Sequence, residues 1–512
     1  MTVSQKSVAS KPKKVSEIQQ WHIETDVAIV GFGAAGSCAA IEAAETGVKV
    51  DVFEAGSAIG GSTALSGGEV YLGGSGGTRM QNLFGFSDST ENLYNYLMMQ
   101  HSPQADEAKI RAYAEGASAH FDWLEAKGIP FKESYLDERL VEPFSDDCLI
   151  WSGNEKSWPE INHCQPVPRA HVVKMQGMGA GKVFMEHLEQ TAIELGVNVH
   201  LEARALCLIH DDSENVIGLV VRINGQELNV KANGGVILCA GGFVMNQTML
   251  KQYAPRFARC NTPIGNPGDT GAGIQMGMSM GAAAINMHEG FASLPFYPPS
   301  TLTYGIIVTD KGQRFINEDA YHGRVGSHLL EQNSDRFYLI VDVEAYGDYE
   351  QMNFLNADVV ATADSAEELE QELGLAANSL SHTMNFYNEH AAQGEDPLFH
   401  KQPEWLRVLT PPLVALDITP ERGVYMPYFT LGGLDTEPTG EVRKTDGTLI
   451  SGLYAAGRTA CGVPRRGAGY SSGISIGDAS FSGRRAGLAA AKRAKASGAL
   501  SRQQQAHEPS LR

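Results

Sequence analysis

The sequence lacks the cysteine patterns that hold small secreted or metal-binding domains together. Its seven cysteines form no CxxC pair, so neither a disulfide framework, a zinc cluster nor a haem-attachment motif is indicated. An odd number of scattered thiols is typical of a cytosolic protein, and we predict a cytoplasmic location and no metal site. No apolar run approaches the roughly 18 residues that a transmembrane helix needs, so no membrane span is expected.

Positive charge is also scarce. Lys and Arg number 40 against 60 Asp and Glu, which leaves a net charge of −20. A nucleic-acid partner needs cations to replace phosphate counterions, and an anionic membrane surface attracts the same groups. The composition therefore argues against both partners. The hydrophobic fraction of 43% is nevertheless that of a globular chain.

Alternating strand and helix patterns predict a nucleotide-binding fold. Residues 25–31 form a short β-branched run, 34–46 an Ala-rich helix, and 48–54 a second strand. This βαβ unit is followed by further expected elements: a helix over 182–195, a strand over 197–206, a hairpin over 215–232 turning at Asn224-Gly225, a strand over 234–240, a helix over 268–284 and a strand over 452–456. The predicted fold class is α/β, a split Rossmann-like domain.

Composition changes near residue 290 and indicate an inserted domain. Residues 291–299 are aromatic and Pro-rich, and 335–400 are acidic and helix-rich, before the doubly wound pattern resumes near 425. We expect this insert to be an α+β cap over the substrate. The predicted divisions are a disordered tail (1–20), the first part of the nucleotide-binding domain (21–289), the inserted cap domain (290–425), the second part of the nucleotide-binding domain (426–495) and a polar tail (496–512).

Glycine is abundant, at 56 of 512 residues or about 11%, against a usual share near 7%. Gly31, Gly33 and Gly36 form a GxGxxG between a predicted strand and helix. The first allows a tight turn, the second lets backbone approach a pyrophosphate, and the third lets the helix pack on the strand. Glu54 follows about 20 residues later, where an acidic side chain accepts from ribose hydroxyls. A dinucleotide site is therefore predicted.

Four further glycine-rich sets follow. One is the loop 60–68 (GGSTALSGG), two end apolar strands at Ala240-Gly241 and at Ala456-Gly457, and the last, 466–476, leads into a C-terminal helix. The helix start offers free N–H groups and a positive dipole end.

Together these five sets resemble the FAD-binding pattern of the fumarate reductase/succinate dehydrogenase flavoprotein family over most of residues 24–490. The resemblance implies FAD between the split domain and the cap. It also implies non-covalent FAD, because Ser62 stands where succinate dehydrogenases carry the attachment histidine. The residues expected to contact FAD are Gly31, Gly33, Ala35, Gly36, Glu54, Ala55, Gly61, Ser62, Thr63, Ser66, Gly67, Ala205, Ala240, Gly241, Gly457, Arg458, Ser475 and Ile476.

The expected substrate is neutral, since the cations by which this family holds dicarboxylates are missing. Tyr470 stands where an arginine is expected, and Tyr428 and Phe429 precede the Thr430-Leu-Gly-Gly element in place of a histidine. A buried dianion without cations would be strongly disfavoured. Tyr321, Tyr470 and Ser472 instead resemble the site of 3-ketosteroid dehydrogenases, most closely the Δ4-(5α) enzymes.

The reaction implied is dehydrogenation of a 5α-3-ketosteroid to a 4,5-unsaturated product, in steroid catabolism. It removes a proton from C4 and a hydride from C5, and flavin N5 accepts the hydride. We expect Tyr470 to donate to the C3 carbonyl, Ser472 to accept the proton and Tyr321 to relay it, with His322 assisting. A reversal of the roles of Tyr470 and Ser472 remains open.

Three other functions stay open from the sequence. They are a 3-ketosteroid Δ1-dehydrogenase, a fumarate- or urocanate-like reductase of unsaturated carboxylates, and a catalytically silent flavoprotein that serves as a binding module. The expected partners are a hydrophobic small molecule and an external electron acceptor, because the sequence has no haem or iron–sulfur motif.

Overall fold

Two distant parts of the chain build the largest sheet of the protein. The computed structural model describes residues 11–350, 352 and 354–507. Its nine-stranded sheet has the path β1-β9-β10-β11-β2-β3-β8, with β22 added beside β11 and β21 beside β22. The strands are β1 (Lys13–Lys14), β2 (Ile23–Val30), β3 (Val50–Phe53), β8 (Asn198–His200), β9 (Arg204–His210), β10 (Val216–Ile223), β11 (Gln226–Leu238), β21 (Glu441–Arg443) and β22 (Leu449–Ala455).

Residues 23–53 form the βαβ unit that the sequence pattern predicts. β2 and β3 are parallel and joined by α1 (Ala34–Glu45), and β11 runs parallel to β2 on its other side. Continuous apolar runs form these strands because helices bury the faces of a parallel sheet. The predicted hairpin is also present, with Asn224 at φ 50° and Gly225 at φ 78° in its turn. The α/β fold class is confirmed.

The single strand expected over residues 197–206 is wrong. The structure divides this stretch into β8 and β9, which lie at different places in the sheet: β8 pairs with β3, whereas β9 pairs with β10. A turn separates them, and Glu202 adopts φ 53° there. The apolar character of the stretch persists across this turn, which is why hydrophobicity alone suggested one strand.

The predicted tails are more ordered than expected. Lys13 and Lys14 pair in parallel with Ile209 and His210, so the prediction of disorder is wrong for this part of residues 1–20. At the other end, α12 (Ile474–His507) continues through most of the predicted polar tail. Residues 1–10 and 508–512 of those tails lie outside the described residues.

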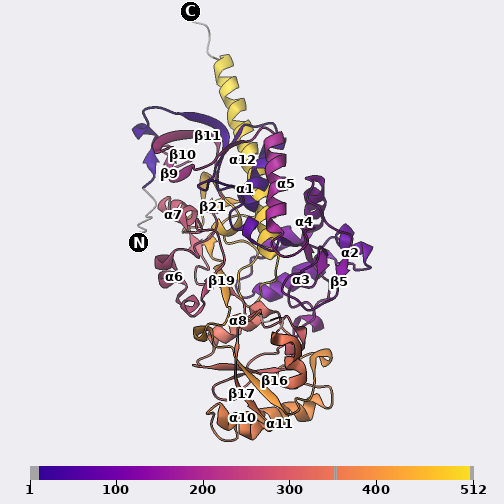
Figure 1. Cartoon of the computed structure of the whole chain (residues 1–512). Coiled ribbons are helices and arrows are strands. Elements are labelled where there is room, and N and C mark those ends of the chain that lie inside the picture. Colours follow the sequence, from indigo (N-terminus) through magenta and orange to yellow (C-terminus); the bar gives the residue numbers. More distant parts are fainter. Residues whose placement is uncertain (1–10, 351, 353, 508–512) are drawn as a thin grey trace, which may run out of the picture.

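The insert carries its own antiparallel sheet, in the order β15-β16-β18-β17. Figure 1 shows it as the lower lobe, at the opposite end from the C-terminal part of α12. The predicted helix-rich stretch corresponds to the helices that flank this sheet. These elements are β15 (Ile306–Thr309), α8 (His322–Glu331), β16 (Phe337–Asp342), α9 (Val343–Tyr346), β17 (Asp358–Ala363), α10 (Ala366–Glu372), α11 (Ser379–Ala391) and β18 (Leu413–Asp417).

Smaller elements lie around the large sheet and toward the cap (Figure 1). β14 pairs with β19 at the chain positions where the insert begins and ends. The remaining elements are β4 (Glu69–Tyr71), α2 (Arg79–Leu83), α3 (Thr90–His101), α4 (Glu107–Ala126), β5 (Tyr135–Leu136), β6 (Leu149–Ile150), β7 (Ala170–Val172), α5 (Gly181–Glu194), α6 (Gln247–Tyr253), β12 (Thr262–Pro263), α7 (Ala272–Ser279), β13 (Ala284–Ile285), β14 (Gly290–Ala292), β19 (Pro427–Thr430) and β20 (Gly433–Leu434).

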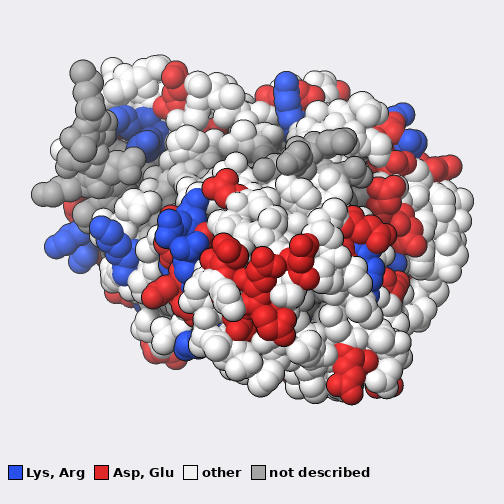
Figure 2. All heavy atoms as spheres, turned by 60° about the horizontal axis from the view of Figure 1, so that its bottom comes forward, with Lys and Arg blue, Asp and Glu red and all other residues white. Residues whose placement is uncertain are grey.

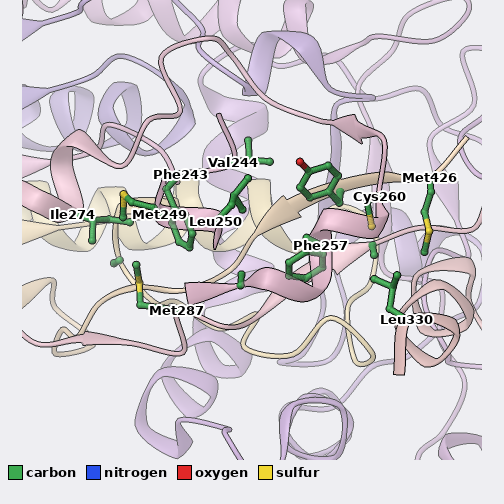
Figure 3. Packing of buried hydrophobic residues seen from close by; sticks show 14 of the residues in the cluster. Phe243, Val244, Met249, Leu250, Phe257, Cys260, Ile274, Met287, Leu330 and Met426 are labelled. Atoms are coloured by element: carbon green, nitrogen blue, oxygen red, sulfur yellow. The ribbon is translucent and has the colours of Figure 1, made fainter. Parts of the chain in front are cut away.

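One apolar core extends from the large sheet into the cap. Figure 3 shows part of it, where Phe243, Met249 and Ile274 pack together. The same buried cluster includes residues of the inserted sheet such as Leu339 and Leu416. Buried apolar area stabilises the fold by about 25 cal/mol per Å², so this shared core holds the cap against the sheet.

The surface carries the excess of acid. Exposed carboxylates gather at α10, including Glu367, Glu368 and Glu372, and Figure 2 shows red patches on the end of the molecule that carries the inserted sheet. All seven cysteines are free. Among the described residues, no cluster of His, Cys, Asp and Glu could hold a metal ion, and no helix is long and apolar enough to cross a membrane.

Candidate active site

A large cavity runs from the large sheet to the cap. Its volume is about 1000 Å³, at the upper end of ligand pockets. Of the predicted FAD contacts, all except Gly36 line it, and so do Tyr470 and Ser472. The sequence motifs, which are spread over more than 440 positions from Gly31 to Ile476, therefore meet at one place.

The turn after β2 is as tight as the GxGxxG predicts. Gly31 has φ 95°, and a Cβ there would lie 2.5 Å from the carbonyl oxygen of Cys239. A Cβ on Gly36 would overlap the carbonyl oxygen of Gly31, which explains why Gly36 packs helix on strand and does not reach the cavity. The N-terminus of α1 is thus brought to the cavity wall, where its free N–H groups suit phosphate oxygens.

Glu54 is fixed by backbone donors. Its carboxylate accepts from the N–H of Phe32 at 2.8 Å and of Gly56 at 2.7 Å. Each carboxylate oxygen has further lone pairs, so both can still accept from a ribose hydroxyl. Thr63 Oγ1 accepts from the N–H of Ala34 at 3.3 Å and ties the glycine-rich loop to the first turn of α1.

Asp269 joins three of the glycine-rich sets and was not foreseen from the sequence. Its Oδ2 accepts from Ser62 Oγ and from Arg458 Nη2, both at 2.6 Å. A Cβ on Gly241 would overlap its Oδ1. Ser62 and Arg458 therefore shape the cavity through Asp269, in addition to lining it. The only sequence signal was the glycine- and Asn-rich turn before α7, in which Asp269 stands between Gly268 and Gly271.

The second helix start also lies at the cavity. α12 begins at Ile474, so Ser475 and Ile476 occupy its first turn. Ser475 Oγ is buried and has no hydrogen-bond partner among the described residues. A buried polar atom without a partner is costly, which indicates that a bound molecule satisfies it. The glycine cradle, the two helix starts and this orphaned hydroxyl fit the phosphates and polar ring edge of FAD.

Two of the proposed catalytic side chains are in direct contact. The hydroxyls of Tyr321 and Ser472 are 2.6 Å apart. Tyr321 does not line the cavity itself, so it lies behind Ser472. Tyr321 stands just before α8, where its backbone N–H donates to Asn154 Oδ1 at 3.0 Å. Asn154, which the sequence reading missed, fixes the position of the tyrosine that reaches Ser472.

Both Tyr470 and Tyr321 keep their phenolic protons at neutral pH. Burial raises the pKa of Tyr470 to about 12. Burial also raises the pKa of Tyr321 well above its usual value, and the hydrogen bond with Ser472 opposes the shift. Each phenol is therefore a hydrogen-bond donor under ordinary conditions.

Aromatic side chains wall the part of the cavity near these hydroxyls. Phe291 has its ring centroid 4.6 Å from that of Tyr470 and 5.0 Å from that of Phe429. Among the described residues, the arginines that line the cavity are Arg204, Arg222 and Arg458. Arg458 is paired with Asp269, and the other two lie on β9 and β10. The wall around Tyr470 thus offers hydroxyls and apolar rings.

Arg139 is a second residue that sequence reasoning missed. Its guanidinium donates to the carbonyl oxygens of Glu318, Asp319 and Ala320, and stacks 3.9 Å from the ring centroid of Tyr297. These carbonyls immediately precede Tyr321, so Arg139 holds the turn that carries it. No local sequence feature links the two, because Arg139 lies about 180 residues earlier.

Arg314 and Glu318 form a buried ion pair in the cap that is structural. Arg314 donates to Glu318 at 2.7 and 3.0 Å and to Asp396 at 2.8 and 3.0 Å, while Lys401 lies 3.4 Å from Glu318. All four side chains are buried in the cap, and none lines the cavity. Their role is to hold the segment before Tyr321.

Fold and site together define an FAD-dependent oxidoreductase of two domains, in which a split Rossmann-like domain is closed by an inserted cap. Comparison with protein families agrees, since the model of the FAD binding domain matches residues 26–475. The chain belongs to this family, and its cofactor is FAD.

The relatives extend over nearly the whole chain. A 3-oxo-5-alpha-steroid 4-dehydrogenase of Comamonas testosteroni is 26% identical, covering 86% of this chain and 93% of the relative. A fumarate reductase (cytochrome) of Shewanella frigidimarina is 27% identical, covering 93% and 78%. The crystal structure of the 3-ketosteroid-Δ4-(5α)-dehydrogenase of Rhodococcus jostii RHA1, in complex with 4-androstene-3,17-dione, has a TM-score of 0.89 and 40% identity, covering 94% and 100%.

Proposed function

We propose that this enzyme is a 3-ketosteroid dehydrogenase that introduces a 4,5 double bond into 5α-3-ketosteroids, in steroid catabolism. One observation carries the proposal: the hydrogen-bonded Ser472 and Tyr321 hydroxyls lie at an aromatic cavity wall beside Tyr470, and Arg458, the lining arginine near this wall, is paired with Asp269. The likeness to the Rhodococcus and Comamonas enzymes supports the same substrate class.

The neutral phenol of Tyr470 provides the donor for the C3 carbonyl. Loss of the C4 proton places negative charge on the carbonyl oxygen, and a preorganised donor stabilises that charge in the transition state. Its raised pKa, about 12, keeps the proton in place across the physiological range.

Ser472 accepts the C4 proton as its own hydroxyl proton passes to Tyr321. A serine alone is a weak base, and the 2.6 Å contact with Tyr321 provides the relay that the transfer needs. Tyr321 in turn releases its phenolic proton toward solvent. FAD, held at the glycine-rich cradle and the two helix starts, would supply the acceptor for the C5 hydride, and an external acceptor would be needed for the two electrons.

His322 is not part of this relay. Burial lowers the pKa of its imidazole to about 3, so it carries no extra proton at neutral pH. The phenol of Tyr321 bonds to Ser472, and the imidazole of His322 bonds instead to Ser293. We therefore propose a relay of Ser472 and Tyr321 without the assistance of His322.

The test is anaerobic titration of the purified yellow holoenzyme with 5α-androstane-3,17-dione, followed by identification of the product. Bleaching of the flavin and a 4-ene-3-ketone product are expected, with turnover once an artificial acceptor is added. A 1-ene product would instead establish a Δ1-dehydrogenase. Oxidation of the reduced enzyme by fumarate, without any reaction with steroid, would refute the proposal.

A further inference from the structure

Two polar side chains of the cap face the cavity without a part in the proposed reaction. His322 is the first residue of α8, and Ser293 directly follows β14. Both line the cavity, and each is only 2% exposed. Their environment is otherwise aromatic, with the rings of Phe291, Tyr297 and Tyr321 around the imidazole.

The contact between them fixes the tautomer of the histidine. Ser293 Oγ and His322 Nδ1 are 2.7 Å apart. Within the described part of the chain, the serine hydroxyl has no other partner, so its proton is satisfied only if it donates to Nδ1. A neutral imidazole that accepts at Nδ1 carries its hydrogen on Nε2.

The Nε2–H donor is left without a partner. Nε2 is buried, and no described residue accepts from it. Burial and the nearby Arg139 lower the pKa of His322, so the group is neutral and is matched to a neutral acceptor oxygen rather than to a carboxylate. A buried donor in a ligand cavity is costly while it is unpaired, and the cost is removed when a ligand oxygen arrives.

The Nε2–H donor of His322 is a different group from the Tyr470 phenol, which holds the reacting ketone in the proposed mechanism. Phe291 stands beside both, with centroid distances of 4.6 Å to Tyr470 and 6.1 Å to His322. The imidazole packs beside Tyr321, with 4.0 Å between the ring centroids, and His322 itself lines the cavity whereas Tyr321 does not.

We propose that His322, oriented by Ser293, is a specificity residue whose Nε2–H binds a second oxygen of the substrate, a carbonyl or hydroxyl other than the reacting 3-ketone. The inference rests on the proposed steroid substrate and adds to it a requirement for a second oxygen. It predicts that the enzyme discriminates between two ketosteroids that differ only at that oxygen.

The experiment compares 5α-androstane-3,17-dione with 5α-androstan-3-one, which lacks the 17-oxygen. In the wild-type holoenzyme the dione is favoured in kcat/KM by about 5- to 100-fold, chiefly through KM, because the deoxy compound leaves the donor unpaired. His322→Phe keeps a ring but removes the donor, and the preference should fall to within about twofold. His322→Gln, which restores an N–H, should recover part of it.

Ser327→Ala is the matched control, since Ser327 is a buried residue of α8 whose hydroxyl also lacks a partner but does not line the cavity. It should leave the preference unchanged. A preference that survives in His322→Phe, or equal losses on both substrates, overturns the inference while steroid turnover stands. Absence of binding and turnover of both steroids by the wild type overturns the proposed function as well.

Discussion

Removal of the Tyr321 hydroxyl is the most direct test of the proton relay. In the structure this hydroxyl reaches Ser472 at 2.6 Å, and Asn154 fixes the backbone beside it. Positioned acid–base groups contribute about 10²- to 10⁴-fold to rate, or about 3–5 kcal/mol of activation free energy. We expect Tyr321→Phe to reduce the rate of flavin reduction by this factor. FAD content should not change, because Tyr321 does not line the cavity.

Stability must be separated from catalysis in this test. The variant leaves Ser472 without its partner, which costs about 1–3 kcal/mol of folding free energy. Tyr387→Phe is the control, since Tyr387 is another buried tyrosine of the cap and its hydroxyl donates only weakly, at 3.4 Å, to the carbonyl oxygen of Tyr304. It should lose at most a similar amount of stability and keep its rate of flavin reduction.

A double-mutant cycle gives the decisive comparison. If Ser472 and Tyr321 act as one relay, Ser472→Ala and Tyr321→Phe should each abolish it, and the double variant should be hardly slower than either. The assay is anaerobic stopped-flow reduction of the flavin by the 5α-3-ketosteroid. Losses that multiply in the double variant, or a Tyr321→Phe rate within twofold of the wild type, would refute the relay.

Three further predictions concern the cofactor cradle, the cap and pH. Gly241→Ala should reduce FAD retention on gel filtration at least about tenfold, because the added Cβ would displace Asp269. Gly47→Ala is the control and should retain FAD, since Gly47 also has a positive φ but a Cβ there would meet nothing within 4 Å. Arg314→Met should lower the free energy of unfolding, measured by denaturant titration, by about 3–5 kcal/mol, because the buried carboxylates of Glu318 and Asp396 lose their guanidinium partner. Lys182→Met is the control: it removes an exposed ion pair and should change the free energy of unfolding by less than about 0.5 kcal/mol. Because the pKa of Tyr470 is raised to about 12, its phenol remains a hydrogen-bond donor as pH rises. We therefore expect no fall in kcat/KM from ionisation of Tyr470 between pH 7 and 10. A fall centred near pH 10 in the wild type that is absent from Tyr470→Phe would contradict this.

Local pattern predicted the elements that depend on neighbouring residues. The unit from β2 to β3 follows from an apolar run, a glycine turn and an Ala-rich helix, all within residues 23–53. β1 could not be found in this way, because two lysines carry no strand pattern and their pairing with Ile209 depends on the edge of a sheet formed much later in the chain. The turn at Glu202 was hidden for a similar reason, since apolar residues continue on both sides of it.

The contacts between distant segments limited what could be said of the site. Ser62 was expected to face FAD, and it does line the cavity, but its hydroxyl is held by Asp269, 207 residues away. The sequence placed Tyr321 and Ser472 in one site only through a family resemblance, and in the structure their hydroxyls are 2.6 Å apart. Asn154 accepts a hydrogen bond from the backbone of Tyr321 through its amide oxygen, and Arg139 donates to the three backbone carbonyls that precede Tyr321. Neither contact produces a recognisable pattern in the sequence around Asn154 or Arg139.

The glycine excess has a second physical cause besides the cofactor. On α12, a Cβ at Gly483 would overlap the carbonyl oxygen of Ala35, and a Cβ at Gly487 that of Ala39, so these glycines let α12 pack directly on the backbone of α1. Both helices begin at the cavity, at Ala34 and Ile474. Their close packing therefore fixes the separation of the two helix N-termini, which are suited to the phosphates and to the polar ring edge of FAD. The contact between α1 and α12 belongs to the cofactor site in this sense, because it sets the distance between the groups that would hold these two parts of the cofactor.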